Sequence, residues 1–103
     1  MNSKRRKELE AKGWKFGGVE DFLGLTDEEL EYIEVKITLS EMVKDYRERN
    51  GLTQIAAAKI LESSQSRLSK IETADPTVSI DLQIKSLLAL GATKEDIGQK
   101  IAC

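Results

Sequence analysis

Apolar residues recur at helical spacing over most of the chain. The first pattern begins after Thr26, and its apolar stripe comprises Leu30, Ile33, Ile37, Met42, Val43 and Tyr46,. It ends at the pair Asn50–Gly51, which is typical of helix ends,. The stripe shifts near its middle, where Thr38 and Glu41 have the spacing of a capping box,. The pattern therefore predicts either one kinked helix or two consecutive helices between Thr26 and Asn50.

Four shorter helices are predicted after this stretch. Their N-cap residues are Thr53, Ser63 or Ser64, Ser79 and Thr93, and the helices span 54–61, 65–72, 80–90 and 94–101,. Residues 73–78 are predicted to form a loop, because Pro76 disfavours helix at Asp75,. In the helix 80–90 the inward residues are expected to be Leu82, Leu87, Leu88 and Leu90, followed by Gly91 as its C-cap,.

The composition favours a small helical bundle. Aromatic residues make up 5% of the 103 residues and charged residues 33%, so the core must be aliphatic and small,. One proline and 40% hydrophobic residues argue against both disorder and a β-sandwich,. We expect an all-α bundle of five or six helices, with an N-terminal extension over 1–25 and the main domain over 26–103. The extension has a basic start, to which a short helix ending at Gly13 is assigned, and then an aromatic and glycine-rich loop,.

Several classes of protein are excluded by what the chain lacks. Histidine is absent and Cys103 is the one cysteine, so we expect no disulfide within the chain, no metal site and no catalytic residues,. No phosphate-binding loop motif is present, and no cofactor is expected. No apolar run approaches the roughly 20 residues of a membrane span, and no signal peptide is recognisable. These features predict a cytoplasmic protein that is not an enzyme and does not enter membranes.

The net charge of −2 hides a strong asymmetry. Residues 1–15 hold six basic side chains against two acidic ones, whereas residues 20–34 hold seven acidic side chains and no basic one. Residues 44–72 again favour basic side chains, six against four. A uniform basic coat for nucleic acid is therefore missing. Any contact with DNA must be confined to one face, and the acidic stretch should lie away from it.

The helix 65–72 is polar on most of its surface. Its apolar residues are Leu68 and Ile71, which leaves the remaining side chains free to face outward. Amide, hydroxyl and guanidinium groups on a short helix suit the reading of base edges in a DNA major groove. Gln54 and Gln65 lie eleven residues apart at the starts of two successive helices. This spacing places Gln54 near the phosphate backbone and Gln65 at the groove floor. The inward residues of the preceding helix are expected to be Ala57, Ala58 and Leu61.

At these residues the chain resembles the Xre, or lambda-repressor-like, family of helix-turn-helix proteins. The resemblance rests on LTQ at 52–54, Ala58, SSQSRLSKIE at 63–72, Pro76, and an arginine, Arg47, four residues before GLTQ. It implies a lambda-repressor-like bundle and a salt bridge between Arg47 and Glu72. The residues predicted to contact double-stranded DNA are Thr53, Gln54, Ser64, Gln65, Ser66, Arg67, Ser69, Lys70 and Thr77,. Thr77 belongs to the loop after the helix 65–72, from which Ser79 could also bond a phosphate.

The motif departs from the family pattern at two places. Glu62 stands in the turn where the family usually has glycine, because the backbone φ angle is positive there. A side chain at such a position costs about 1 kcal/mol. Ile55 replaces a usually polar residue, and Ala57 replaces a larger aliphatic one. Ile55 is therefore expected to be a partly exposed apolar group.

The extension GWKFGGVEDFLGLTDEE and the later LLALGA are similar to a subgroup, the HigA-type antitoxins encoded beside RelE/HigB-like toxins. This resemblance implies a homodimer that represses its own promoter at a palindromic operator and neutralises a small basic toxin. The alternatives are a stand-alone or phage-type repressor, a protein-interaction module that no longer binds DNA, and a plain helical hairpin. The basic KRRK segment is either a phosphate-binding arm or a solvated terminus. Trp14, Phe16, Phe22 and Leu23 form either a flap over the bundle or a partner surface,.

Overall fold

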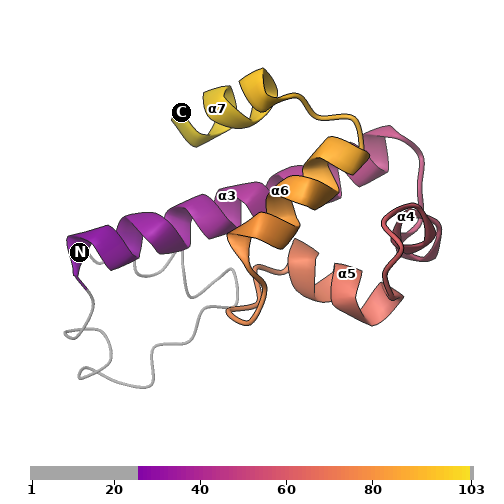
Figure 1. Ribbon diagram of the computed structural model, residues 1–103, viewed down its shortest axis with the longest axis horizontal. Helices are drawn as coiled ribbons and strands as arrows, with labels where there is room; N and C mark the ends of the chain where they lie inside the picture. Colours follow the sequence, from indigo (N-terminus) through magenta and orange to yellow (C-terminus); the bar gives the residue numbers. More distant parts are fainter. Residues whose placement is uncertain (1–25, 103) are drawn as a thin grey trace.

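The computed structural model describes residues 26–102, and all regular structure in this range is helical. Five helices follow one another: α3 (Asp27–Arg49), α4 (Gln54–Ile60), α5 (Gln65–Glu72), α6 (Ile80–Ala89) and α7 (Lys94–Ala102) (Figure 1). The predicted all-α bundle is thereby confirmed. None of these helices is long and apolar enough to cross a membrane. The helix and aromatic loop assigned to residues 1–25, and Cys103, lie outside the described residues.

The stretch between Thr26 and Asn50 is one continuous helix, so the two-helix alternative is wrong. Thr26 caps it, its hydroxyl accepting a hydrogen bond from the Glu29 amide at 3.1 Å. Thr38 lies inside the helix and caps nothing. The shift of the apolar stripe reflects a change of packing partners along α3. Its early residues pack around Ala74, whereas its later ones join the main core.

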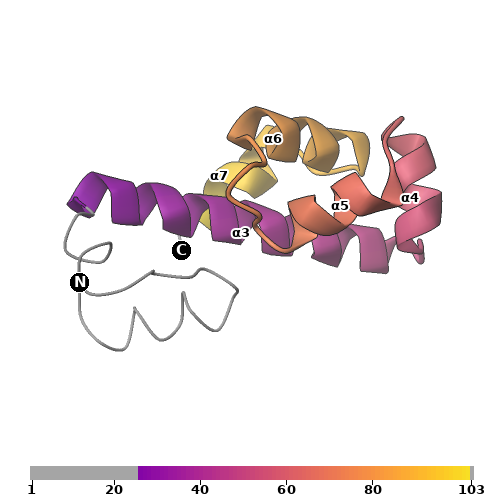
Figure 2. The ribbon, with the colours of Figure 1, turned by 90° about the horizontal axis from the view of Figure 1, so that it is seen from below.

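The long helix α3 is the frame on which the other elements pack. It contacts α5, α6 and α7, while α4 packs on α5 (Figure 2). The main core is aliphatic, as expected from the composition. Its largest fully buried apolar side chains are Leu39, Val43, Leu68, Ile71 and Leu87.

The inward face of α6 differs from the prediction. Leu87 and Leu90 are buried and Leu82 is partly buried, but Leu88 is 50% exposed. Leu88 follows Leu87 directly and so lies about 100° further round the helix. Two polar residues, Gln83 and Ser86, complete the buried stripe instead.

The ends of four helices share one backbone arrangement. The residue after each C-cap has a positive φ angle: Gly51 (68°), Glu62 (53°), Ala74 (56°) and Gly91 (103°). In each case the next amide bonds back to a carbonyl in the last turn, as from Ser63 to Ala58 at 2.8 Å,. Glycine adopts this conformation without strain, but Glu62 and Ala74 do not. The turn between α4 and α5 therefore stores strain at Glu62.

Replacing Glu62 with glycine is expected to raise the free energy of unfolding by about 1 kcal/mol, because the strain of a left-handed side-chain residue is removed. Chemical denaturation followed by circular dichroism measures this change. Glu62→Gln is the matched control, since it removes the same charge and keeps the strain. A gain of equal size in the glutamine variant would trace the effect to charge and contradict the prediction.

Candidate nucleic-acid interface

Helices α4 and α5 pack closely because the facing residues are small or aliphatic. Ala57 and Ala58 of α4 are buried, and so are Leu68 and Ile71 of α5. The hydroxyls of two N-cap residues order the helix starts. Thr53 accepts a hydrogen bond from the Ala56 amide, and Ser64 accepts one from the Arg67 amide, both at 3.1 Å. Because each hydroxyl only accepts here, its hydrogen remains able to donate to a phosphate oxygen.

The outer face of α5 is polar and exposed. Gln65, Ser66, Arg67 and Lys70 are exposed, and Ser69 is half-buried. The two apolar residues, Leu68 and Ile71, are almost completely buried. The helix therefore presents donors of several kinds on the side that faces away from the bundle. Ile55 of α4 is 55% exposed, as the sequence indicates.

A hollow of about 390 Å³ lies between α5 and the start of α6. Two cations border it, Arg67 and Lys70, together with the hydroxyl residues Ser64, Ser66, Thr77 and Ser79. Cationic and hydroxyl groups of this kind suit an anionic group such as a DNA phosphate. Ser79 caps α6, where its oxygen accepts from the Leu82 amide at 3.1 Å and its hydrogen remains able to donate,.

Thr77 is less available than the sequence suggests. Its amide and its hydroxyl both donate to Asp75 Oδ1, at 2.8 and 2.5 Å. These bonds hold the pKa of Asp75 below its ordinary value,. Thr77 must release one of them before it can donate to a phosphate. The hydrogen bonds to Asp75 therefore compete with the predicted contact between Thr77 and phosphate. Ser79 donates no such bond and remains able to donate to a phosphate.

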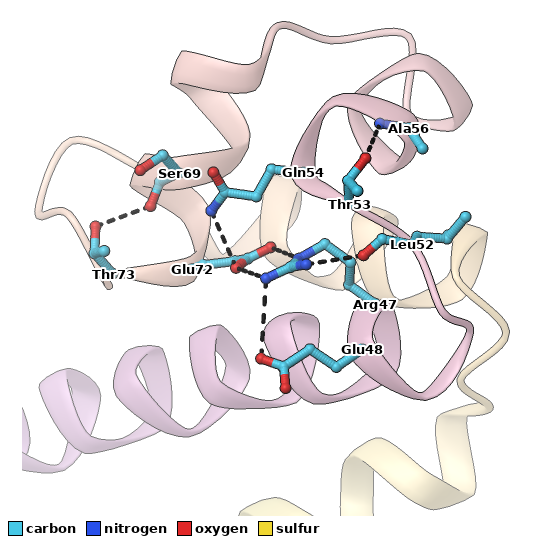
Figure 3. A network of polar contacts seen from close by, with 9 residues as sticks. All are labelled: Arg47, Glu48, Leu52, Thr53, Gln54, Ala56, Ser69, Glu72 and Thr73. Carbon is cyan, nitrogen blue, oxygen red and sulfur yellow. Dashed lines mark hydrogen bonds and ion pairs between the residues drawn. The ribbon is translucent and has the colours of Figure 1, made fainter.

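Arg47 and Glu72 form the salt bridge that the family resemblance implies (Figure 3). Arg47 Nε lies 2.6 Å from Glu72 Oε2, and Arg47 Nη2 lies 3.0 Å from Glu72 Oε1. Arg47 Nη1 also donates to the Leu52 carbonyl at 2.9 Å. The side chains are only 13% and 3% exposed, and the hydrogen bond to Glu72 raises the pKa of Arg47. This bidentate pair ties the end of α5 to α3.

Gln54 joins the same network. Its Nε2 donates to Glu72 Oε1 at 3.3 Å, which holds the amide at the first turn of α4. The nitrogen carries a second hydrogen that this bond does not use. The amide is thus fixed in place and still able to donate outward, as a phosphate contact requires.

The acidic part of α3 is remote from this face. Asp27, Glu28 and Glu29 occupy its first turn, at the end opposite the one that α4 follows (Figure 1). These carboxylates suit the helix dipole at that end. The expectation that the acidic stretch 20–34 lies away from DNA stays a prediction, and its residues 20–25 lie outside the described residues.

Three residues near the site were not singled out from the sequence. Lys36, Ser40 and Gln83 are buried polar residues where α3 meets α6 and the loop after α5. The sequence does indicate that Lys36 is buried, because it follows Ile33 by three residues and therefore lies on the apolar stripe of α3. A polar residue on such a stripe must find partners inside the protein.

Comparison with known proteins agrees with this geometry. A family model described as a helix-turn-helix domain matches residues 38–99. The match includes α4, α5 and every residue predicted to contact DNA. No curated protein and no solved structure matches the chain. Within residues 26–102, no group of three or more His, Cys, Asp or Glu side chains is placed to hold a metal ion.

Proposed function

The chain belongs to the helix-turn-helix domain family of DNA-binding regulators, and on this premise we propose that it recognises a specific operator through α5. The observation that carries the proposal is the outward polar face of α5, held on a frame fixed by the Arg47–Glu72 pair. The proposed activity is binding alone, without catalysis.

In this proposal, two side chains at the start of α5 read bases. Gln65 can bond N6 and N7 of an adenine, and Arg67 can bond O6 and N7 of a guanine. Ser66, Ser69 and Lys70 add contacts along the groove, while the first turn of α4 binds the phosphate backbone through Thr53 and Gln54. The contacts to the phosphate backbone set the register of the protein on the duplex and carry no sequence information.

We further propose that the protein binds as a homodimer and represses transcription. Two copies related by a two-fold axis would place two α5 helices in successive major grooves. The half-sites of a palindromic operator would then lie about 34 Å apart, one turn of the double helix.

Selection from a randomised DNA library tests the proposal directly. We expect an inverted repeat to be enriched, and its binding constant to fall steeply as salt rises, because each neutralised phosphate releases counterions. The promoter of the protein's own gene then tests repression. Enrichment of no sequence, together with salt-independent behaviour, would favour the alternative of a protein-interaction module.

A second proposal is that the protein is the antitoxin of a HigB/RelE-like toxin. Its support is the resemblance of the N-terminal extension to HigA-type antitoxins, together with the acidic first turn of α3, which suits a basic partner,. Co-expression with the neighbouring open reading frame is the test. The proposal requires a stable complex and protection from toxicity, and a lack of both would leave a stand-alone repressor.

A further inference from the structure

Lys36 is a buried cation in the middle of α3. The residue is 3% exposed, and its ammonium nitrogen donates to the Pro76 carbonyl at 3.3 Å. The same nitrogen lies 5.6 Å from the centre of the Tyr32 ring, a distance typical of a cation–π contact. Lys36 therefore connects the helix α3 to the loop between α5 and α6, forty residues further along the chain.

The loop that Lys36 contacts is the one that borders the hollow beside α5. Asp75 organises it, accepting two bonds from Thr77 and one, through its carbonyl, from the Val78 amide at 3.0 Å. Thr77 and Ser79 then line the hollow together with Arg67. The placement of these hydroxyl residues therefore depends on the position of Asp75 and Pro76.

The main chain of Lys36 contacts the helix that follows this loop. Its carbonyl accepts a hydrogen bond from Gln83 Nε2 of α6 at 2.9 Å. Gln83 Nε2 also lies 2.7 Å from Ser40 Oγ of α3, and the Gln83 side chain is completely buried. One residue of α3 thus contacts both the loop and the helix that follows it.

Burying an ammonium group is unfavourable, since it loses its hydration. Burial lowers the pKa of Lys36, and the nearby Asp75 carboxylate opposes this shift,. A methionine side chain would fill similar space without that cost. The ammonium group is therefore unfavourable for the core itself, and its hydrogen bond is made to the loop.

We propose that Lys36 is a positioning residue, whose ammonium group holds the 75–79 loop in the arrangement that places the Ser79 hydroxyl beside Arg67 and Lys70, where it can donate to the DNA backbone. The proposal rests on the proposed function, because it assigns to Lys36 an indirect role in DNA binding. Lys36 itself, being buried, contacts no phosphate.

Amide hydrogen exchange of the free protein tests the first half of the proposal. We expect Lys36→Met to speed exchange at the Thr77 and Val78 amides by about tenfold, or about 1.4 kcal/mol, while the core of α3 stays protected. Lys44→Met is the matched control, because Lys44 lies exposed on the same helix and carries the same charge. Unchanged exchange in the Lys36 variant would overturn the proposal.

Binding to the selected operator tests the second half. The affinity of Lys36→Met should fall about tenfold, with an unchanged slope of log K against log salt, because no phosphate contact is lost. A slope reduced by about one would identify Lys36 as a direct phosphate contact and overturn its indirect role. An unchanged affinity beside a loosened loop would overturn the proposal as well.

Two further outcomes are possible: the unmodified protein selects no DNA, or the Lys36 variant does not fold. If the unmodified protein selects no DNA, the proposed function fails, and loop exchange still decides whether Lys36 holds the loop. If Lys36→Met does not fold, Tyr32→Leu replaces it, because Tyr32 is 51% exposed and its loss should leave the fold intact. This variant should speed loop exchange by a smaller factor, and unchanged exchange would then overturn the proposal.

Discussion

Replacing Arg47 with methionine is expected to lower the free energy of unfolding by about 3–5 kcal/mol, the cost typical of breaking a buried ion pair from one side. The substitution leaves the Glu72 carboxylate, which is 3% exposed, with Gln54 as its remaining hydrogen-bond partner in the network. It also removes the donor to the Leu52 carbonyl. Because small domains are stable by only about 5–15 kcal/mol, this is a large fraction of the total. Thermal and chemical denaturation measure it.

An exposed ion pair in the same helix provides the control. Arg49 and Asp45 are four residues apart, with side chains 67% and 53% exposed. Arg49→Met should cost about 0.3–0.5 kcal/mol for the exposed pair, and about 0.5–1 kcal/mol for the contact of its guanidinium with the Tyr46 ring, whose centre is 5.4 Å away,. A similar cost for both variants would show that burial does not strengthen the Arg47 pair.

The double variant Arg47→Met with Glu72→Met separates the charge from the packing. Removing both charges leaves no buried ion without a partner, so the double variant should be more stable than Arg47→Met alone. Glu72→Met alone completes the comparison. If the cost of the double variant equals the sum of the costs of the two single variants, the instability of Arg47→Met does not come from an unpaired carboxylate.

Local rules of helix formation account for what the sequence predicts well. Hydroxyl N-caps at Thr26, Thr53, Ser64 and Ser79 act over three residues, and so they are readable without knowledge of the fold,. The polar face of α5 is equally local. The buried Arg47–Glu72 pair is 25 residues apart in the chain, and only the resemblance to a known family implied it.

Tertiary packing decides the features that the sequence does not predict. Leucine is expected inside, yet Leu88 is exposed while Gln83 is buried, because the angular position of each residue on α6 outweighs its polarity. The Gln83 amide nitrogen has partners inside the protein, the Lys36 carbonyl and Ser40 Oγ, whereas its buried Oε1 has none among the described residues,. Lys36 and Ser40 lie more than 40 residues before Gln83 in the chain. Both belong to α3, which the sequence predicted to be either one helix or two.

Replacing Gln65 and Arg67 together with alanine is expected to weaken binding to the selected operator by about 30-fold to 10⁴-fold, since each bidentate base contact contributes about 1–3 kcal/mol of discrimination. Both side chains are exposed on α5. Their loss should therefore leave the circular dichroism spectrum and the thermal midpoint nearly unchanged. Fluorescence anisotropy with operator DNA and with a scrambled duplex measures the two affinities.

The scrambled duplex shows whether base reading is what was lost. Affinity for the scrambled duplex should fall far less. Its salt slope should drop by about one, because Arg67 is expected to neutralise a phosphate on a duplex that lacks the operator guanine. Gln99→Ala with Lys100→Ala is the matched control, because it removes an exposed amide and an exposed cation from α7, which packs on α3. If the α5 variant lost operator and scrambled binding by the same factor, α5 would bind only the backbone. If it retained specific binding, another element would read the bases, and the recognition role of α5 would be wrong.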